Sequence, residues 1–180
     1  MHIRPAIEAD AEPLRRYAEA LFAEHLPGIY EREKPTLEEE MEFLRSHIEP
    51  ANSTMLVAEE GGRIVGVLGF LGRKLAEEAH TGSVGLSVAN GYRDRGIGTA
   101  LIEELFAWAP RHGITRIEIE SWSNNPGATR LYKRLGFVEE GLARDAIIRD
   151  GERIDVHLMA RLAPLGMDSR TPARGGLSAE

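Results

Sequence analysis

A short glycine-containing loop in the middle of the chain carries the residue types that bind a phosphate. It comprises Arg93, Asp94, Arg95, Gly96, Ile97 and Gly98, and it follows an apolar run, residues 84–88, that is typical of a buried strand. From Ile97 onward apolar residues recur at helical spacing, so the loop opens a helix whose first-turn N–H groups have no partner within the helix. Because Gly96 and Gly98 place no side chain over these groups, we expect the loop to hold a pyrophosphate.

Two other phosphate-binding motifs share part of this spacing. Gly91 and Gly96 have the separation of a Walker A loop, but Ile97 and Gly98 stand where Lys and Ser or Thr are required. Gly96 and Gly98 match the start of a dinucleotide fingerprint, but Leu101 replaces its third glycine. A nucleotide-phosphate enzyme is therefore an alternative that only measurable ATP or NAD binding would support.

The elements that must position this loop alternate in the order β-α-α-β-β-β-α-β-α-β-β. Strands are predicted over residues 2–7, 54–58, 63–71, 83–88 and 115–121, and the last strands over 137–138, 143–149 and 153–159. Helices are predicted over residues 11–25, after Thr36, from Ile97, and from Pro126 to the stop signal at Gly136. Asp10 and Asn125 are predicted helix N-caps, and Thr36 with Glu39 forms a predicted capping box.

The composition is that of an ordinary globular domain. The 180 residues are 42% hydrophobic and 28% charged, which suits one domain over residues 1–162, followed by a disordered tail at 163–180 that is rich in Gly, Pro, Ser and Ala. Neither a membrane-spanning run nor a secretory signal is present in the sequence, so we expect a cytoplasmic protein without a membrane partner. The net charge of −7 argues against nucleic acid, and the lack of cysteine excludes disulfides.

Two motifs resemble one known family. The pattern Arg93-x-x-Gly96-x-Gly98 resembles the Arg/Gln-x-x-Gly-x-Gly/Ala acetyl-CoA loop of the GCN5-related N-acetyltransferase (GNAT) superfamily. The segment from Asn125 to Phe137 is similar to the superfamily's Asn-x-x-Ala-x-x-Leu-Tyr-x-x-x-Gly-Phe pattern, and the element order agrees over residues 2–161. The resemblance implies an α/β (α+β) acyl-CoA N-acyltransferase fold, with a mixed, mostly antiparallel sheet of about seven strands and about four helices. It also implies acetyl transfer from acetyl-CoA to a primary amine of a small molecule, peptide or protein.

The resemblance further assigns roles to individual residues. The main chain of Val88, Ala89 and Asn90 would pair with the pantetheine arm of acetyl-CoA, and the amide of Val88 or Ala89 would donate to the thioester carbonyl. Asn125 would bind pantetheine as well as cap its helix. Tyr132 would protonate the departing thiolate, a role that its phenol can fill, or it would simply pack in the core.

The general base is indicated less directly by the sequence than the other residue roles are. A lysine amine, with a pKa of about 10.4, needs a base more than an α-amine of about 7.8 does. The central strand carries no carboxylate, but Glu118 and Glu120 lie two apart in the next strand and so share one face. Glu120 precedes Tyr132 by the spacing seen in the branch that acetylates protein amino termini. We therefore predict Glu120 as the base, acting directly or through water, with an ordinary surface glutamate as the alternative.

Several points stay open at this level. The side chains of Arg93 and Arg95 either reach phosphates or are solvated. By resemblance the first two helices and their loop shape the acceptor pocket, although their acidic run is also typical of a solvated face: Glu31, Glu33, Glu38, Glu39 and Glu40. No metal site is predicted, and a homodimer is compatible with the family. A non-catalytic acyl-CoA-binding sensor or interaction module is the main alternative to an enzyme.

Overall fold

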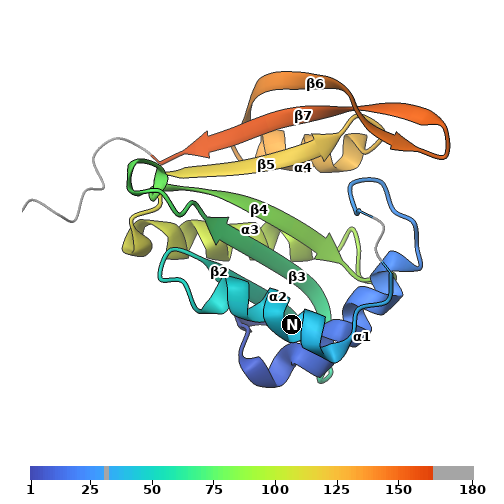
Figure 1. Cartoon of the computed structure of the whole chain (residues 1–180), viewed down its shortest axis with the longest axis vertical. Helices are drawn as coiled ribbons and strands as arrows, with labels where there is room; N and C mark the ends of the chain where they lie inside the picture. Colours follow the sequence, from blue (N-terminus) through green and yellow to red (C-terminus); the bar gives the residue numbers. More distant parts are fainter. Residues whose placement is uncertain (31–32, 164–180) are drawn as a thin grey trace, which may run out of the picture.

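The computed structural model describes residues 1–30 and 33–163, and it contains a seven-stranded sheet with helices on both faces (Figure 1). The strands are β1 (His2–Pro5), β2 (Thr54–Glu60), β3 (Arg63–Gly72), β4 (Thr81–Val88), β5 (Arg116–Trp122), β6 (Val138–Arg149) and β7 (Glu152–Leu162). The α-helices are α1 (Ala11–Phe22), α2 (Leu37–Ile48), α3 (Ile97–Trp108) and α4 (Pro126–Arg134). The predicted fold class and element order are confirmed. The tail predicted from residue 163 onward lies, apart from Ala163, outside the described residues.

The sheet divides into two parts between β4 and β5. Its strand order is β1-β2-β3-β4-β5-β7-β6, and β4 with β5 is its parallel pair. That ladder ends at Val84↔Ile119, although β4 continues to Val88 and β5 to Trp122. Beyond Val84 the strands therefore separate, and β5, β6 and β7 form the upper part of the sheet in Figure 1.

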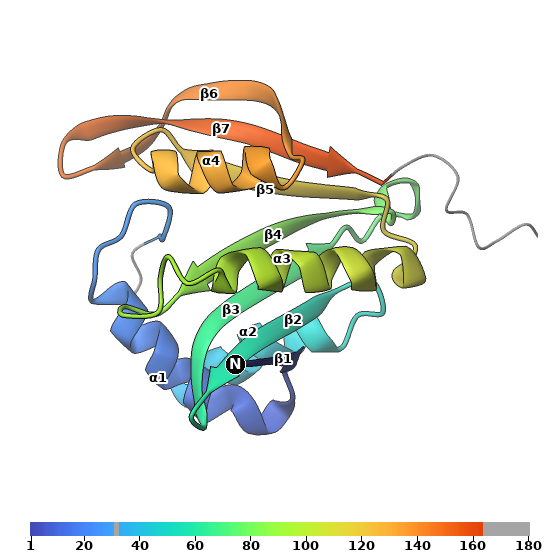
Figure 2. The same ribbon diagram turned by 180° about the vertical axis from the view of Figure 1, so that it is seen from behind.

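Helices α1 and α2 cover one face of the sheet (Figure 1), and α3 and α4 cover the opposite face (Figure 2). On the first face Leu14 and Leu44 pack against Met55 and Val57 of β2. On the second face the apolar side of α3 packs against β3, β4 and β5, and Tyr132 of α4 joins the same cluster. Because β2 is covered on both faces, five successive residues from Thr54 are buried, which is why it has no polar alternation.

Two helix starts follow the predicted local chemistry. Thr36 accepts a hydrogen bond from the N–H of Glu39 (3.2 Å), and the Glu39 carboxylate accepts one from the N–H of Thr36 (2.8 Å). The Asn125 Oδ1 atom accepts a bond from the N–H of Ala128 (3.2 Å). The capping box and the asparagine cap are confirmed.

The prediction that Asp10 caps the first helix is wrong. Its two carboxylate oxygens accept hydrogen bonds from Arg4 at 2.7 and 2.8 Å, and one of them also accepts the N–H of Ile7 at 2.9 Å. The carboxylate therefore anchors β1 instead of capping α1, which ends at Phe22, before the predicted end at residue 25.

The C-terminal strands also differ from the prediction. The segments predicted at 137–138 and 143–149 form the single strand β6, which stays paired with β7 through two register shifts, one of them between Ala143 and Ile147.

None of the helices in residues 1–30 and 33–163 has the length and apolar character that a membrane span requires.

Candidate active site

Beyond Val84 a gap separates β4 from β5. Along the edge of β4 that faces this gap, backbone N–H and C=O groups form no hydrogen bond with a neighbouring strand of the described sheet. Ala89 donates its N–H to the carbonyl of Val65 on β3 (2.9 Å). Because alternate residues of an antiparallel strand direct their polar groups to the same side, Leu86 and Val88 direct theirs away from β3, toward the gap. Of the two predicted donors to a thioester carbonyl, the Ala89 amide is thus engaged within the sheet, whereas the Val88 amide faces the gap. Asn90 follows in an exposed turn.

The glycine loop lines a cavity of about 620 Å³, to which Asp94, Gly96, Ile97 and Gly98 contribute. Gly96 precedes α3 with a φ of +81°, a conformation that favours glycine. An added Cβ on Gly98 would lie 3.3 Å from Leu86 and 3.5 Å from the side chain of Leu131, so β4, α3 and α4 approach closely there. The uncovered N–H groups of the first turn of α3 fit an anionic diphosphate.

Both arginines of the loop are bound to acidic residues. Arg93 donates to the two carboxylate oxygens of Glu24 at 2.8 Å each, and its Nε donates to the carbonyl of Val88 at 2.9 Å. The hydrogen bond to Glu24 raises the pKa of the arginine. Arg95 pairs with Glu60 on β2 (2.9 Å), and Arg93, unlike Arg95, lines the cavity. Arg93 therefore braces the end of β4 against the segment that follows α1.

The structure adds residues that the sequence reasoning missed. Arg130 and Arg134 of α4 line the smaller cavity and add positive charge to it. Their separation of four residues on one helix face, within the second motif, was a signal that could have found them.

Tyr17 of α1 donates its hydroxyl to the Oγ of Ser87 on β4 (2.9 Å), and burial raises the pKa of Tyr17 to about 12. No sequence pattern links that pair.

A larger cavity of about 1290 Å³ lies between α1, α2 and strands β3, β4 and β5. The two cavities share wall residues: Leu21, Gly28, Ile29, Leu86, Ser87, Glu120, Trp122 and Tyr132. The shared walls place their junction at the gap between β4 and β5. A ligand in the smaller cavity can therefore meet a second ligand in the larger one.

Tyr132 lies at this junction. It is 7% exposed, and its ring centroid is 5.9 Å from that of Phe137. In the described part of the chain, the Tyr132 hydroxyl makes no hydrogen bond. Every buried side-chain oxygen of that part has a hydrogen-bond partner, so the unbonded hydroxyl is not buried and is exposed to the cavities. Burial raises the pKa of the phenol to about 12, which keeps it protonated as a donor.

Glu118 and Glu120 both line the larger cavity, but their surroundings differ. Glu118 accepts hydrogen bonds from Arg73 (2.8 Å) and Arg116 (3.0 Å). Burial acts to raise the pKa of Glu118, but the two guanidinium groups outweigh it and hold the pKa below its usual value. Glu120 is exposed, lines both cavities, and forms no ion pair with another described residue. Of the two carboxylates, only Glu118 is therefore held by charged partners in the described part of the chain.

The loop after α1 crosses the junction and is tied to the upper part of the sheet. Asn125, besides capping α4, donates its Nδ2 to the carbonyl of Pro27 (3.0 Å). Arg149, at the end of β6, donates to the carbonyls of Leu26 (2.9 Å) and Ile29 (2.6 Å). These bonds hold residues 26–29 as a wall of the smaller cavity, and Gly28 and Ile29 also line the larger one.

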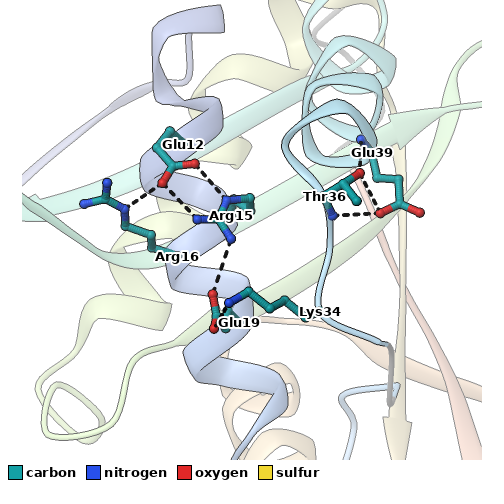
Figure 3. A network of polar contacts seen from close by, with 7 residues as sticks. All are labelled: Glu12, Arg15, Arg16, Glu19, Lys34, Thr36 and Glu39. Carbon is teal, nitrogen blue, oxygen red and sulfur yellow. Dashed lines mark hydrogen bonds and ion pairs between the residues drawn. The ribbon is translucent and has the colours of Figure 1, made fainter.

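A network of ion pairs on α1 holds the segment that leads into α2 (Figure 3). Lys34 lies 2.5 Å from the carboxylate of Glu19, which also accepts a bond from Arg15 (3.4 Å), and Arg15 binds Glu12. Each exposed pair contributes little because water and salt screen it, but together the pairs place Lys34 on the wall of the larger cavity. The acidic residues expected around the acceptor divide as follows: Glu33, Glu39 and Glu40 line this cavity, Glu38 does not, and Glu31 lies outside the described residues.

Comparison with known proteins identifies relatives of the chain. A sequence model of the Acetyltransferase (GNAT) family matches residues 16–137. The chain is 31% identical over 108 residues to the L-amino acid N-acetyltransferase AaaT of Escherichia coli strain K12, covering 59% of this chain and 67% of that protein. It is 34% identical over 134 residues to the N-alpha-acetyltransferase of Sulfurisphaera tokodaii, covering 68% of this chain and 76% of that protein.

Solved structures share the fold. The acetyltransferase of the GNAT family from Streptococcus pneumoniae superimposes with a TM-score of 0.84 at 27% identity, covering 90% of this chain and 98% of that chain. The structure of yncA from Salmonella typhimurium with its cofactor acetyl-CoA gives a TM-score of 0.82 at 21% identity, covering 96% of each chain. The matched family segment contains the glycine loop, Glu120 and Tyr132, and the chain therefore belongs to the acetyltransferase (GNAT) family.

Proposed function

We propose that this chain is an acetyl-CoA-dependent N-acetyltransferase that acts on a primary amine of a small molecule, peptide or protein. The observation that carries the proposal is the junction of the two cavities, because Glu120 and Tyr132 line both of them. Direct attack in a ternary complex needs two ligands that meet at one point, with a base and an acid beside it. The structure of yncA, which has a similar fold, contains its cofactor acetyl-CoA. This supports acetyl-CoA as the ligand of the smaller cavity.

The smaller cavity suits acetyl-CoA, which supplies the activated acetyl group. The first-turn N–H groups of α3 at Gly96 to Gly98 would hold the diphosphate, and Arg130 and Arg134 would add positive charge. The N–H of Val88 would donate to the thioester carbonyl. Because this N–H belongs to a strand, it is already oriented and needs no reorganisation as negative charge develops on the oxygen.

The larger cavity would hold the amine. As the bond from nitrogen to the acetyl carbon forms and the bond from that carbon to sulfur breaks, Glu120 would take one proton from nitrogen, directly or through water. Tyr132 would give one proton to sulfur. Burial raises the pKa of Tyr132 to about 12, so the phenol keeps its proton until a thiolate departs beside it.

The test is release of free thiol from acetyl-CoA by the purified protein with a panel of amines. We expect Glu120→Gln and Tyr132→Phe each to lower kcat by about 100-fold or more while coenzyme A still binds. Glu118→Gln is the matched control, and it should change kcat much less because Glu118 is held by two arginines. Coenzyme A binding without thiol release from any amine would favour the non-catalytic acyl-CoA-binding module instead. Displacement of coenzyme A by ATP or NAD would favour a nucleotide-phosphate enzyme.

A further inference from the structure

His47 of α2 has one ring nitrogen that is bonded and one that is open to the larger cavity. The residue is 3% exposed, and it lines that cavity. Its Nδ1 atom lies 2.8 Å from the carbonyl oxygen of Phe43, one turn earlier in the helix. Its Nε2 atom makes no hydrogen bond with another described residue. Every buried side-chain nitrogen or oxygen in that part of the chain has a partner, so Nε2 is exposed to the cavity.

The surroundings of Nδ1 fix the position of the imidazole proton. A carbonyl oxygen can only accept a hydrogen bond, so Nδ1 carries the proton and donates it to Phe43. The Oγ of Ser46 lies 3.1 Å from Nδ1, but its hydroxyl donates to the same carbonyl (2.7 Å) and has no proton left for Nδ1. Burial lowers the pKa of His47, so the ring is neutral near pH 7. Nε2 therefore presents an unshared electron pair to the cavity and can only accept a hydrogen bond.

Nε2 lies over the sheet in the same row as the proposed base. Gly69 of β3 pairs with Gly85 of β4. The register of β4 and β5, continued beyond their last pair, places Gly85 opposite Glu120. An added Cβ on Gly69 would lie 2.8 Å from Nε2, whereas one on Gly85 would meet no described atom within 4 Å. Gly69 and Gly85 thus form a glycine floor between His47 and Glu120, and two strand spacings give it a width of about 10 Å.

The acidic residues of the same cavity lie away from His47. Glu39 and Glu40 belong to the first turn of α2, about 10–12 Å along the helix from His47. Glu39 is held in the capping box, and Glu40 is buried and is not a free carboxylate. Glu33 is exposed in the segment that leads into α2, where its negative charge attracts a cationic amine to the cavity. Two further carboxylates are paired with arginines: Glu118 and Glu140.

The cavity wall around Nε2 is apolar. The ring of Phe43 packs edge-on against that of His47, with centroids 4.6 Å apart. Three apolar residues of β2 and β3, all beside or opposite Gly69, also line the cavity: Met55, Val67 and Leu71. Burial and the Phe43 carbonyl shift the pKa of His47 without a contribution from any charged residue in 1–30 and 33–163. A second charge placed there would lose its hydration without a counter-charge, whereas an uncharged donor would gain the bond to Nε2.

We propose that His47 is a specificity-determining residue whose Nε2 atom accepts a hydrogen bond from an uncharged donor of the acceptor, remote from the reacting amine. The proposal rests on the acetyl transfer proposed above. The amine reacts beside Glu120, the body of the acceptor crosses the glycine floor, and its donor ends over Gly69. An acceptor that lacks the donor leaves Nε2 unpaired in apolar surroundings and reacts less efficiently.

The experiment compares His47→Asn and His47→Gln with the unaltered protein. The asparagine amide can keep the bond to Phe43 but places no atom at the position of Nε2, whereas the glutamine amide reaches that position and its oxygen can accept a bond. His112→Asn is the matched control. The Nδ1 of His112 is likewise 2.9 Å from a carbonyl one turn earlier, that of Trp108, but His112 is exposed and lines neither cavity.

The acceptors are straight-chain amino alcohols of increasing length, each with two matched amines and a diamine. In one matched amine a methyl group replaces the hydroxyl, and in the other a methyl ether keeps the oxygen but cannot donate. At the length that spans the floor, the unaltered protein should prefer the amino alcohol over both by about ten-fold in kcat/KM. His47→Asn should abolish this preference through KM and leave the alkylamine almost unchanged. His47→Gln should keep much of it, and His112→Asn should match the unaltered protein.

Nitrogen NMR of the unaltered protein provides a readout that needs neither turnover nor a variant. The His47 resonances should show a protonated Nδ1 and an unprotonated Nε2. With coenzyme A present, which carries no acetyl group to transfer, the amino alcohol should move the Nε2 resonance and the alkylamine should not. A protonated Nε2 would overturn the proposal. Thermal unfolding and coenzyme A affinity show whether each variant keeps its fold and its smaller cavity.

Other outcomes overturn the proposal in distinguishable ways. Equal kcat/KM for amino alcohol and alkylamine at every length, or an equal loss for both in His47→Asn, would show that His47 only packs. A preference for the methyl ether would show that Nε2 donates, and a preference for the diamine would make the acidic residues the selecting feature. If no amine releases thiol but the amino alcohol still moves the Nε2 resonance, the proposed function fails while His47 stands as a binding residue. If neither occurs, both fail.

Discussion

Replacing Arg93 by alanine should destabilise the protein as well as weaken its binding of coenzyme A. The change removes two hydrogen bonds to Glu24 and one to the carbonyl of Val88, all of 2.8–2.9 Å. The side chains of Arg93 and Glu24 are 33% and 22% exposed, so their pair is partly shielded from solvent. We assign about 1–2 kcal/mol to this bidentate pair and about 1 kcal/mol to the bond with the carbonyl. The free energy of unfolding should fall by about 2–3 kcal/mol, which lowers the melting temperature by roughly 4–12 °C.

The assay is a double-mutant cycle with Arg93→Ala and Glu24→Gln, followed by urea and thermal unfolding and by coenzyme A titration. The coupling energy between the two sites should be about 1–2 kcal/mol. Arg95→Ala is the control from the same loop: it loses an ion pair with Glu60 in which the side chains are 48% and 34% exposed, so it should cost less than about 1 kcal/mol. Coenzyme A affinity should fall in both Arg93→Ala and Glu24→Gln, because each releases the end of β4.

One result would refute this reasoning. If Arg93→Ala unfolds like the unaltered protein but binds coenzyme A far more weakly, while Glu24→Gln binds it normally, then Arg93 contacts the phosphates directly and does not brace β4. Additive effects of the two changes on stability would point the same way, because independent sites show no coupling.

Two further predictions concern backbone strain and pH. Gly96→Ala should lower the free energy of unfolding by about 1 kcal/mol and weaken coenzyme A binding, because alanine resists a φ of +81°. Gly98→Ala should lower it less, because Gly98 has an ordinary φ and its added Cβ would crowd only the end of the Leu86 side chain, at 3.3 Å. Equal unfolding curves for the two variants would contradict this. Burial lowers the pKa of His47 below 6.5, so the unaltered protein should lose stability as the pH falls from 6.5 toward the folded-state pKa, by up to about 1.4 kcal/mol per pH unit. His47→Gln should flatten that slope in urea unfolding between about pH 7 and about pH 5, and an unchanged slope would assign the effect to another group.

Features that depend on near neighbours in the chain could be predicted from the sequence. The capping box of Thr36 and Glu39 and the cap at Asn125 need partners only three residues away, and both form as expected. The hairpin at Gly61 and Gly62 follows from their positive φ values, which glycine adopts without a steric penalty. The glycine loop and the helix after it are equally local, and together with the motif around Tyr132 they indicate the family from the sequence alone.

Features that depend on segments far apart in the chain could only be found in three dimensions. Periodicity shows which face a residue occupies, but it does not show which charge from a distant segment will lie opposite it. Arg93 therefore binds Glu24, 69 residues away.

The candidate site shows the same division. Sequence spacing placed Glu118 and Glu120 on one face, but only the tertiary structure neutralised Glu118 with two arginines and left Glu120 at the junction of the cavities. The gap between β4 and β5 and the two cavities likewise arise where strands and helices distant in sequence meet. Local chain chemistry thus determined the elements and the family, and packing between distant segments decided which side chains remain available for chemistry.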